Sequence, residues 1–214
     1  MYKSILTVVT ALATSASASD TFYDPTQHPV VVGGQHIAEQ FEPNFPAFPM
    51  IGDVSAPLEI SYFYSYQECS ACSDTSSLLA DFVEDGKVKV YMHPLDQDAY
   101  SIVGAVLYSV NPHVYPAYHF KVMSELSSPT QDFSFERFVS DLADISDAPA
   151  YFYERLNSPI PWTQALQVNS ALSKNLGITH VPTLVIDGVA YKGAPRSEDI
   201  QKLINNKLTS DSEQ

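Results

Sequence analysis

The sequence predicts an α/β fold in which a small mixed sheet is interrupted by a large helical insertion. A strand-like run from Leu58 to Tyr66 is followed at once by a helix-like run from Ser73 to Glu84. Helical patterning then continues through the stretch 98–176. Two short strand-like runs follow that stretch and are joined at Asp187-Gly188.

The first half of the sheet lies in residues 58–92. Leu58 to Tyr66 is dense in Tyr, Phe and Ile, which suits a central strand buried on both faces. The following helix begins near Cys69 and ends near Gly86, with an apolar stripe at helical spacing. Lys87 to Met92 reads as the next strand, and His93-Pro94 is expected to end it. A right-handed crossover through the helix makes the two strands parallel.

The inserted helical block spans residues 98–176. Turns are indicated where Asn, Ser or another small polar residue precedes proline, at Asn111-Pro112, Ser128-Pro129 and Ser158-Pro159. The predicted helices between these turns are 99–110, 116–126, 134–145, 148–156 and 162–176.

The second half of the sheet follows the insertion, and Gly177 is the expected stop of the last inserted helix. Thr183–Ile186 and Val189–Lys192 are predicted strands, joined by an Asp-Gly pair that is a strong hairpin signal. A final amphipathic helix is expected from Ser197 to Leu208. The Ser-rich acidic tail 209–214 is expected to fray.

Residues 1–18 have the pattern of a secretory signal peptide. Ile5 to Ala13 is apolar but too short to span a bilayer, and Ala16-Ser17-Ala18 fits the cleavage pattern. We therefore expect the protein to be exported. Residues 19–55 are rich in proline and phenylalanine and predict an extended arm, with one edge strand at Val30–Val32.

The composition limits the kinds of partner. The chain has 25 acidic and 11 basic residues, a formal net charge of −14 and a pI near 4.5. Such a surface repels nucleic acids and anionic membranes, so we expect neither as a partner. An apolar fraction of 45% is sufficient for an ordinary packed core.

The only two cysteines, Cys69 and Cys72, stand at C-x-x-C spacing at the start of the first predicted helix. The first N–H groups of a helix lack intrahelical partners, and the helix dipole places partial positive charge there. Both effects stabilise a thiolate at Cys69, and the thiolate is the nucleophile of disulfide exchange. Cys72 lies one turn deeper, where its sulfur can release a mixed disulfide. The spacing thus predicts a redox-active pair.

Two other uses of these cysteines stay open. A structural disulfide across two residues closes a very short loop and constrains the unfolded chain little. A structural zinc site needs four ligands, for which His93 and His180 would have to join the cysteines. In either case the protein would be a binding or chaperone-like module. His180 has a further candidate role, as a proton shuttle or thiolate partner near Cys69.

Together these motifs resemble the DsbA-type thiol:disulfide oxidoreductases, which have a thioredoxin-like fold. The resemblance covers Ala56 to Leu208 and rests on the C-x-x-C after a strand, the helical insertion, and Val181-Pro182-Thr183 before a hairpin. It implies a thioredoxin-like domain made of residues 56–97 and 177–208, with an inserted helical subdomain at 98–176.

The resemblance also implies how substrates bind. In this family the proline that matches Pro182 is cis and lies against the active-site disulfide, and an X–Pro bond adopts cis at modest cost. Val181 and Pro182 are therefore expected to bind an extended substrate chain through backbone hydrogen bonds. Valine before the proline resembles the oxidases, whereas the isomerases usually carry threonine. No cofactor is implied, because the Cys69–Cys72 disulfide carries the electrons.

The chain departs from the family pattern at residues that tune the sulfur. Family oxidases often carry Pro-His between the cysteines, but here the pair is Ser70-Ala71, which implies a higher pKa of Cys69 and a less oxidising couple. Glu68 beside Cys69 raises the pKa of that thiol further. The family's buried acid on the preceding strand falls here at Ser61 or Tyr62, so that proton acceptor is missing unless Glu59 or Glu68 substitutes for it.

These observations predict an exported, periplasmic thiol:disulfide oxidoreductase that forms or exchanges disulfides in envelope proteins. The expected partners are unfolded or cysteine-containing envelope proteins and a membrane redox protein. We expect a monomer, because the N-terminal arm is too short to form a large dimerisation domain. A reductase or isomerase on the same fold is the nearest alternative.

Overall fold

The structure is a computed structural model that describes residues 30–31, 49–67, 69–145, 149–158, 160–193 and 196–211. The predicted signal peptide 1–18, most of the predicted arm 19–55, Glu68 and residues 212–214 lie outside these ranges.

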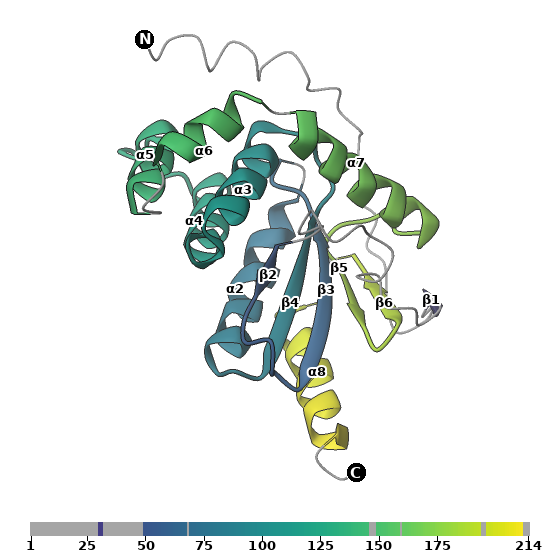
Figure 1. The fold of residues 1–214 in the computed structure, drawn as a ribbon. Coiled ribbons are helices and arrows are strands. Elements are labelled where there is room, and N and C mark those ends of the chain that lie inside the picture. Colours follow the sequence, from purple (N-terminus) through teal and green to yellow (C-terminus); the bar gives the residue numbers. More distant parts are fainter. Residues whose placement is uncertain are drawn as a thin grey trace.

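In the described part of the chain six strands form one mixed sheet, in the order β1-β6-β5-β3-β4-β2 (Figure 1). β3 (Leu58–Tyr64) and β4 (Val88–Pro94) are parallel, as predicted, and the other pairs in this sheet are antiparallel. β5 (Thr183–Ile186) and β6 (Val189–Lys192) form the predicted hairpin. β1 (Val30–Val31) is an edge strand on β6, also as predicted.

Three details of the strands differ from the prediction. β3 ends at Tyr64, two residues early, and β4 continues through His93 and Pro94, which were expected to end it. Pro94 has no N–H to donate, but it can lie in the strand because the next residue, Leu95, donates its N–H to the carbonyl of Tyr64 at 2.9 Å. β2 (Met50–Ile51) was not predicted, because two residues among prolines give no alternation to read.

The helices agree with the prediction to within two residues, except that the last one runs to Asp211, three residues past its predicted end. Within the described residues, no helix is both long and apolar enough to cross a bilayer. The observed helices are α2 (Ser70–Glu84), α3 (Ala99–Val110), the 3-10 helix η3 (Pro112–Val114), α4 (Tyr115–Ser127), α5 (Phe135–Ile145), α6 (Pro149–Leu156), α7 (Ile160–Asn175) and α8 (Ser197–Asp211).

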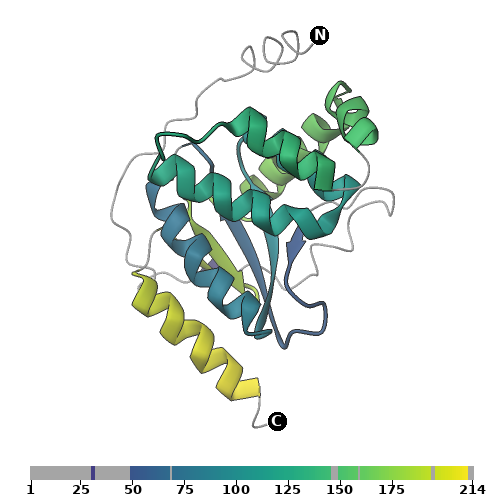
Figure 2. The ribbon, with the colours of Figure 1, turned by 90° about the vertical axis from the view of Figure 1, so that its left-hand side faces the viewer.

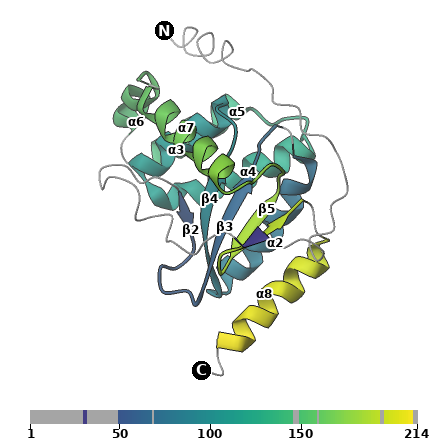
Figure 3. The same cartoon turned by 90° about the vertical axis from the view of Figure 1, so that its right-hand side faces the viewer.

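The helices cover both faces of the sheet. α2 and α8 lie on one face (Figure 2), and α7 lies on the other (Figure 3). The inserted helices α3 to α6 gather at the end of the sheet where β3 and β4 finish (Figure 1). That end is also where the chain passes from β3 into Cys69, so the insertion lies at the same end of the sheet as the cysteine pair.

β3 is buried on both faces only along its C-terminal half. Tyr62 and Tyr64 belong to the main core on the α2 side, whereas Phe63 belongs to a smaller cluster with Ile178 on the opposite face. Nearer the start of the strand Glu59 is exposed. The side chains of β3 are therefore more deeply buried toward the end of the strand that leads into the cysteine pair.

Gly104 lies in the middle of α3, where two rings of α4 approach the helix. A Cβ atom at this position would lie 2.9 Å from Cε1 of Tyr118 and 3.3 Å from Cε2 of Tyr115. Both tyrosines are buried, so neither ring has room to move aside. The absence of a side chain is what lets α3 and α4 pack this closely.

We expect Gly104→Ala to lower the free energy of unfolding by about 1–3 kcal/mol because the added methyl group overpacks this contact. Alanine is otherwise the better helix former, so the sign of the effect is diagnostic. Urea unfolding measures it. Ala105→Gly in the same helix is the control, since it loses helix propensity, about 1 kcal/mol, and the contacts of one half-buried methyl group, but overpacks nothing. An unchanged or raised stability of Gly104→Ala would contradict the close approach.

Candidate active site

Cys69 and Cys72 form a disulfide at the beginning of α2. Cys69 is the N-cap residue of the helix, and the N–H of Cys72 donates to the carbonyl of Cys69 at 3.1 Å. Cys72 is fully buried, whereas Cys69 is half-buried. A substrate sulfur therefore has access to Cys69 while the interior shields Cys72, which is what the predicted roles of the two residues require.

The start of α2 favours negative charge on the outer sulfur. The side chain of Cys69 makes no capping hydrogen bond, and the first turn of the helix has no acidic residue. The N–H groups of Ser70 and Ala71, the first two of the helix, have no acceptor within it and are therefore available to a sulfur anion. Together with the helix dipole they stabilise a Cys69 thiolate once the disulfide is reduced.

A cis peptide bond joins Val181 to Pro182, as the family resemblance implied. This turn leads directly into β5, and Thr183 at the start of β5 pairs with Phe63 near the end of β3. The hydroxyl of Thr183 donates to the carbonyl of His180 at 2.7 Å and closes the turn. The fold thus brings the cis-proline turn to the end of the sheet where the disulfide lies.

The structure also describes three of the other residues singled out from the sequence, Ser70, Ala71 and His180. Ser70 is exposed and Ala71 is half-buried in the first turn of α2. His180 is half-buried beside the cis-proline, with Nδ1 2.8 Å from the hydroxyl of Thr179. A role for His180 toward Cys69 stays a prediction, and Glu68 lies outside the described residues.

The structure separates His93 from the cysteines. The ring of His93 stacks on Phe63, with 4.4 Å between ring centroids, and its Nδ1 lies 3.4 Å from Oδ1 of Asn169. Phe63 faces the opposite side of the sheet from Cys72. Among the described residues, no three His, Cys, Asp or Glu side chains gather into a group that could hold a metal ion.

The residue beneath Cys72 is a tyrosine. The hydroxyl of Tyr62 donates to the carbonyl oxygen of Cys72 at 2.9 Å, and Tyr62 is fully buried. His119 of α4 is buried beside it, with 6.5 Å between the two ring centroids. No sequence pattern assigns a role to His119, because its position depends on the packing of α4 against α2, which no local pattern encodes.

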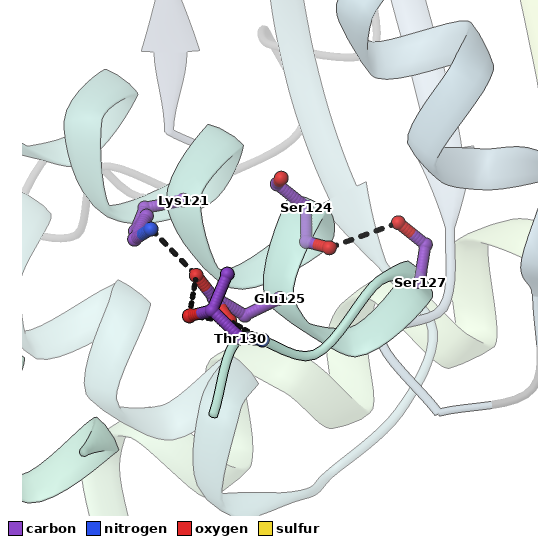
Figure 4. A network of polar contacts seen from close by, with 5 residues as sticks. All are labelled: Lys121, Ser124, Glu125, Ser127 and Thr130. Carbon is purple, nitrogen blue, oxygen red and sulfur yellow. Dashed lines mark hydrogen bonds and ion pairs between the residues drawn. The ribbon is translucent and has the colours of Figure 1, made fainter. Parts of the chain in front are cut away.

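A second polar network lies at the end of α4 (Figure 4). The buried carboxylate of Glu125 accepts hydrogen bonds from Nζ of Lys121 at 2.5 Å and from the N–H of Thr130 at 2.7 Å. These bonds, that from Lys121 foremost, lower the pKa of Glu125 to about 2. The hydroxyl of Ser127 donates to that of Ser73 at 3.0 Å, so the network holds the end of α4 beside the residue that follows Cys72.

A thioredoxin family model matches residues 46–206 of the chain. The thiol-disulfide exchange protein α-DsbA2 of Wolbachia pipientis is similar in structure, at 18% identity and a TM-score of 0.61, covering 75% of this chain and 87% of that chain. The catalytic domain of Proteus mirabilis ScsC is similar at 22% identity and a TM-score of 0.60, covering 78% and 92%. BdbD of Bacillus subtilis is similar at 19% identity and a TM-score of 0.59, covering 76% of this chain and 94% of that chain.

At these identities the solved structures establish the fold, which is the expected thioredoxin-like fold with a helical insertion. No curated protein matches the sequence.

The buried histidines make the stability depend on pH. Burial lowers the pKa of His119 to about 3 and that of His93 to about 3. An exposed histidine titrates near about 6.5. Below that pH the unfolded chain binds protons that the folded chain does not, so the stability is lost as the pH falls from about 6.5 toward 3. Asp98 opposes this trend, because burial raises its pKa to about 6.

We therefore expect the free energy of unfolding to depend less steeply on pH in His119→Gln than in the wild type between pH 6 and pH 4. Each proton that the chain takes up on unfolding changes the free energy of unfolding by about 1.4 kcal/mol per pH unit. Urea unfolding across this range measures the slope, and comparison between variants cancels the contribution of Asp98. His113→Gln, at an exposed histidine, is the control. Equal slopes for wild type and His119→Gln would show that His119 is not held neutral.

Proposed function

We propose that the chain, which belongs to this thioredoxin family, is a thiol:disulfide oxidoreductase of the DsbA type that is exported and forms or exchanges disulfides in envelope proteins. The observation that carries the proposal is the disulfide at the start of α2, with Cys69 accessible and Cys72 buried. The cis Val181–Pro182 turn at the same end of the sheet supports it.

In the oxidising direction, a substrate thiolate attacks the sulfur of Cys69. A bond forms between these two sulfurs, the bond between Cys69 and Cys72 breaks, and Cys72 leaves with the electron pair and takes up a proton. A second substrate thiolate then attacks the first substrate sulfur, and Cys69 leaves as a thiolate stabilised by the helix start. The substrate loses two electrons and two protons, and the protein gains the two electrons.

The two sulfurs carry both electrons, so the proposed reaction uses no bound cofactor. The reduced protein must pass its electrons on before the next cycle, and we assign this step to a membrane redox partner. The proposed substrates are unfolded or cysteine-containing envelope proteins, whose extended chains would bind beside Val181 as an added strand. The signal-like residues 1–18 support a periplasmic location, and the protein would act as a monomer.

Cys72→Ala tests the proposal. Its Cys69 thiolate can still attack a disulfide of an envelope protein and displace one sulfur of that disulfide as a thiolate, but no second sulfur is left in the variant to release the mixed disulfide. We expect this variant to accumulate mixed disulfides with envelope proteins, which non-reducing gels show as bands that disappear on reduction. Cys69→Ala is the matched control and should trap nothing. The wild type should oxidise a dithiol peptide faster than it reduces insulin.

Faster reduction of insulin than oxidation of the dithiol peptide would show that the protein is a reductase. Absence of trapped proteins with Cys72→Ala, together with background rates in both assays for the wild type, would show that the C-x-x-C is a passive clip on a binding module.

A further inference from the structure

A chain of buried hydrogen bonds leads from α4 to the first turn of α2. The hydroxyl of Tyr62 donates to the carbonyl of Cys72 at 2.9 Å, and the hydroxyl of Ser76 donates to that of Tyr62 at 3.3 Å. Ser76 Oγ lies 3.1 Å from Nε2 of His119, and the hydroxyl of Tyr66 lies 3.1 Å from Nδ1 of the same ring. All five residues are buried. We call Tyr66, His119, Ser76 and Tyr62 the buried chain.

The donors of the buried chain all point toward Cys72. Ser76 has one hydroxyl hydrogen, which it donates to Tyr62, so it accepts from His119 and the hydrogen of the neutral ring is on Nε2. Nδ1 of His119 is then the acceptor for the hydroxyl of Tyr66. Every side-chain donor of the buried chain is therefore used, and the last one is fixed on the main chain of the active-site helix.

The buried chain is uncharged in the folded protein. Burial keeps the pKa of His119 far below neutrality and raises the pKa values of Tyr62 and Tyr66. None of these groups gains or loses a proton near neutral pH. The buried chain therefore acts on the site through position and polarity rather than by exchanging protons with the sulfurs.

The hydrogen bond from Tyr62 ties the first turn of α2 to β3, the strand that leads into Cys69. Cys69 and the first turn of α2 are thereby held both by the segment that leads in from β3 and by this bond. Hydrogen bonds in a chain polarise one another, and the peptide group between Cys72 and Ser73 lies at its end. The N–H of Ser73, on the other side of that peptide group, becomes a stronger donor within the first turn, and the polarised peptide group adds to the dipole at the helix start.

We propose that the buried chain positions and polarises the first turn of α2 and so increases the thiolate character of Cys69, with Tyr62 as the positioning residue that acts directly on the helix. This inference rests on the proposed function. It assigns a redox role to tyrosine and histidine residues that would otherwise be ordinary members of the core.

Tyr62→Phe tests the proposal, and Tyr118→Phe is a closely matched control. The hydroxyl of Tyr118 also donates to a main-chain carbonyl, that of Tyr100, at 2.6 Å, and Tyr118 is fully buried but lies outside the buried chain. Tyr62→Phe loses the bond to the carbonyl of Cys72 and the bond accepted from Ser76, and Tyr118→Phe loses its one bond to Tyr100. We therefore expect both variants to lose stability in urea unfolding. If the role of Tyr62 is purely structural, Tyr62→Phe should lose stability but leave the redox properties of Cys69 unchanged.

The redox measurements separate the two variants. In Tyr62→Phe we expect the pH midpoint for alkylation of Cys69 to rise by about half a pH unit to one pH unit, a change in free energy comparable to that of one hydrogen bond. Since a less stable thiolate makes the reduced form less stable, equilibrium with glutathione should shift about fivefold toward the disulfide. The reduction potential of the Cys69–Cys72 couple should then be about 20 mV more negative. Tyr118→Phe should match the wild type in both. Ser76→Ala, which cuts the link to His119, should shift both in the direction of Tyr62→Phe.

If Tyr62→Phe and Ser76→Ala both match Tyr118→Phe while the wild type exchanges disulfides normally, the buried chain is only structural and this inference is wrong, although the proposed function stands. If Tyr62→Phe does not fold, Ser76→Ala alone decides the question. A wild type that exchanges no disulfides would overturn the proposed function and this inference with it.

Discussion

The constraint on which the proposed chemistry depends is the position of a sulfur at the start of a helix, beside the first N–H groups of that helix. Cys69 takes the N-cap position of α2, where no side chain of its own caps the helix, and Cys72 closes the disulfide from the buried side. Negative charge is stabilised there by donors that are already oriented. The same disulfide elsewhere on the surface would have neither the activated sulfur nor the shielded partner.

The rest of the fold serves to hold that helix start in place. β3 is most deeply buried where it approaches Cys69, and the antiparallel strand β5 brings the cis-proline turn to the same end of the sheet. The insertion contributes from the other side, because α4 supplies His119 to the interior and fixes Ser127 against Ser73. The two halves of the sheet and the insertion, distant in sequence, thus meet at one pair of sulfurs.

The sequence was sufficient for features that have a local cause. Periodicity located the helices to within a few residues, and the Asp-Gly pair at 187–188 located the hairpin. The residues that support the cysteines were not accessible in this way. Tyr62 was identified only as the position of a missing acid, and His119 and Glu125 were not identified at all, because their partners come from packing between helices. Burial of a tyrosine is readable in a sequence, whereas the partner of its hydroxyl is not.

The central claim is that the helix start primes Cys69 as a thiolate. The most direct measurement is the rate of iodoacetamide alkylation of Cys69 in the fully reduced wild-type protein as a function of pH. We expect a midpoint well below the value of about 8.5 for a free cysteine, with rapid reaction at neutral pH. An unshifted midpoint with slow alkylation would contradict it.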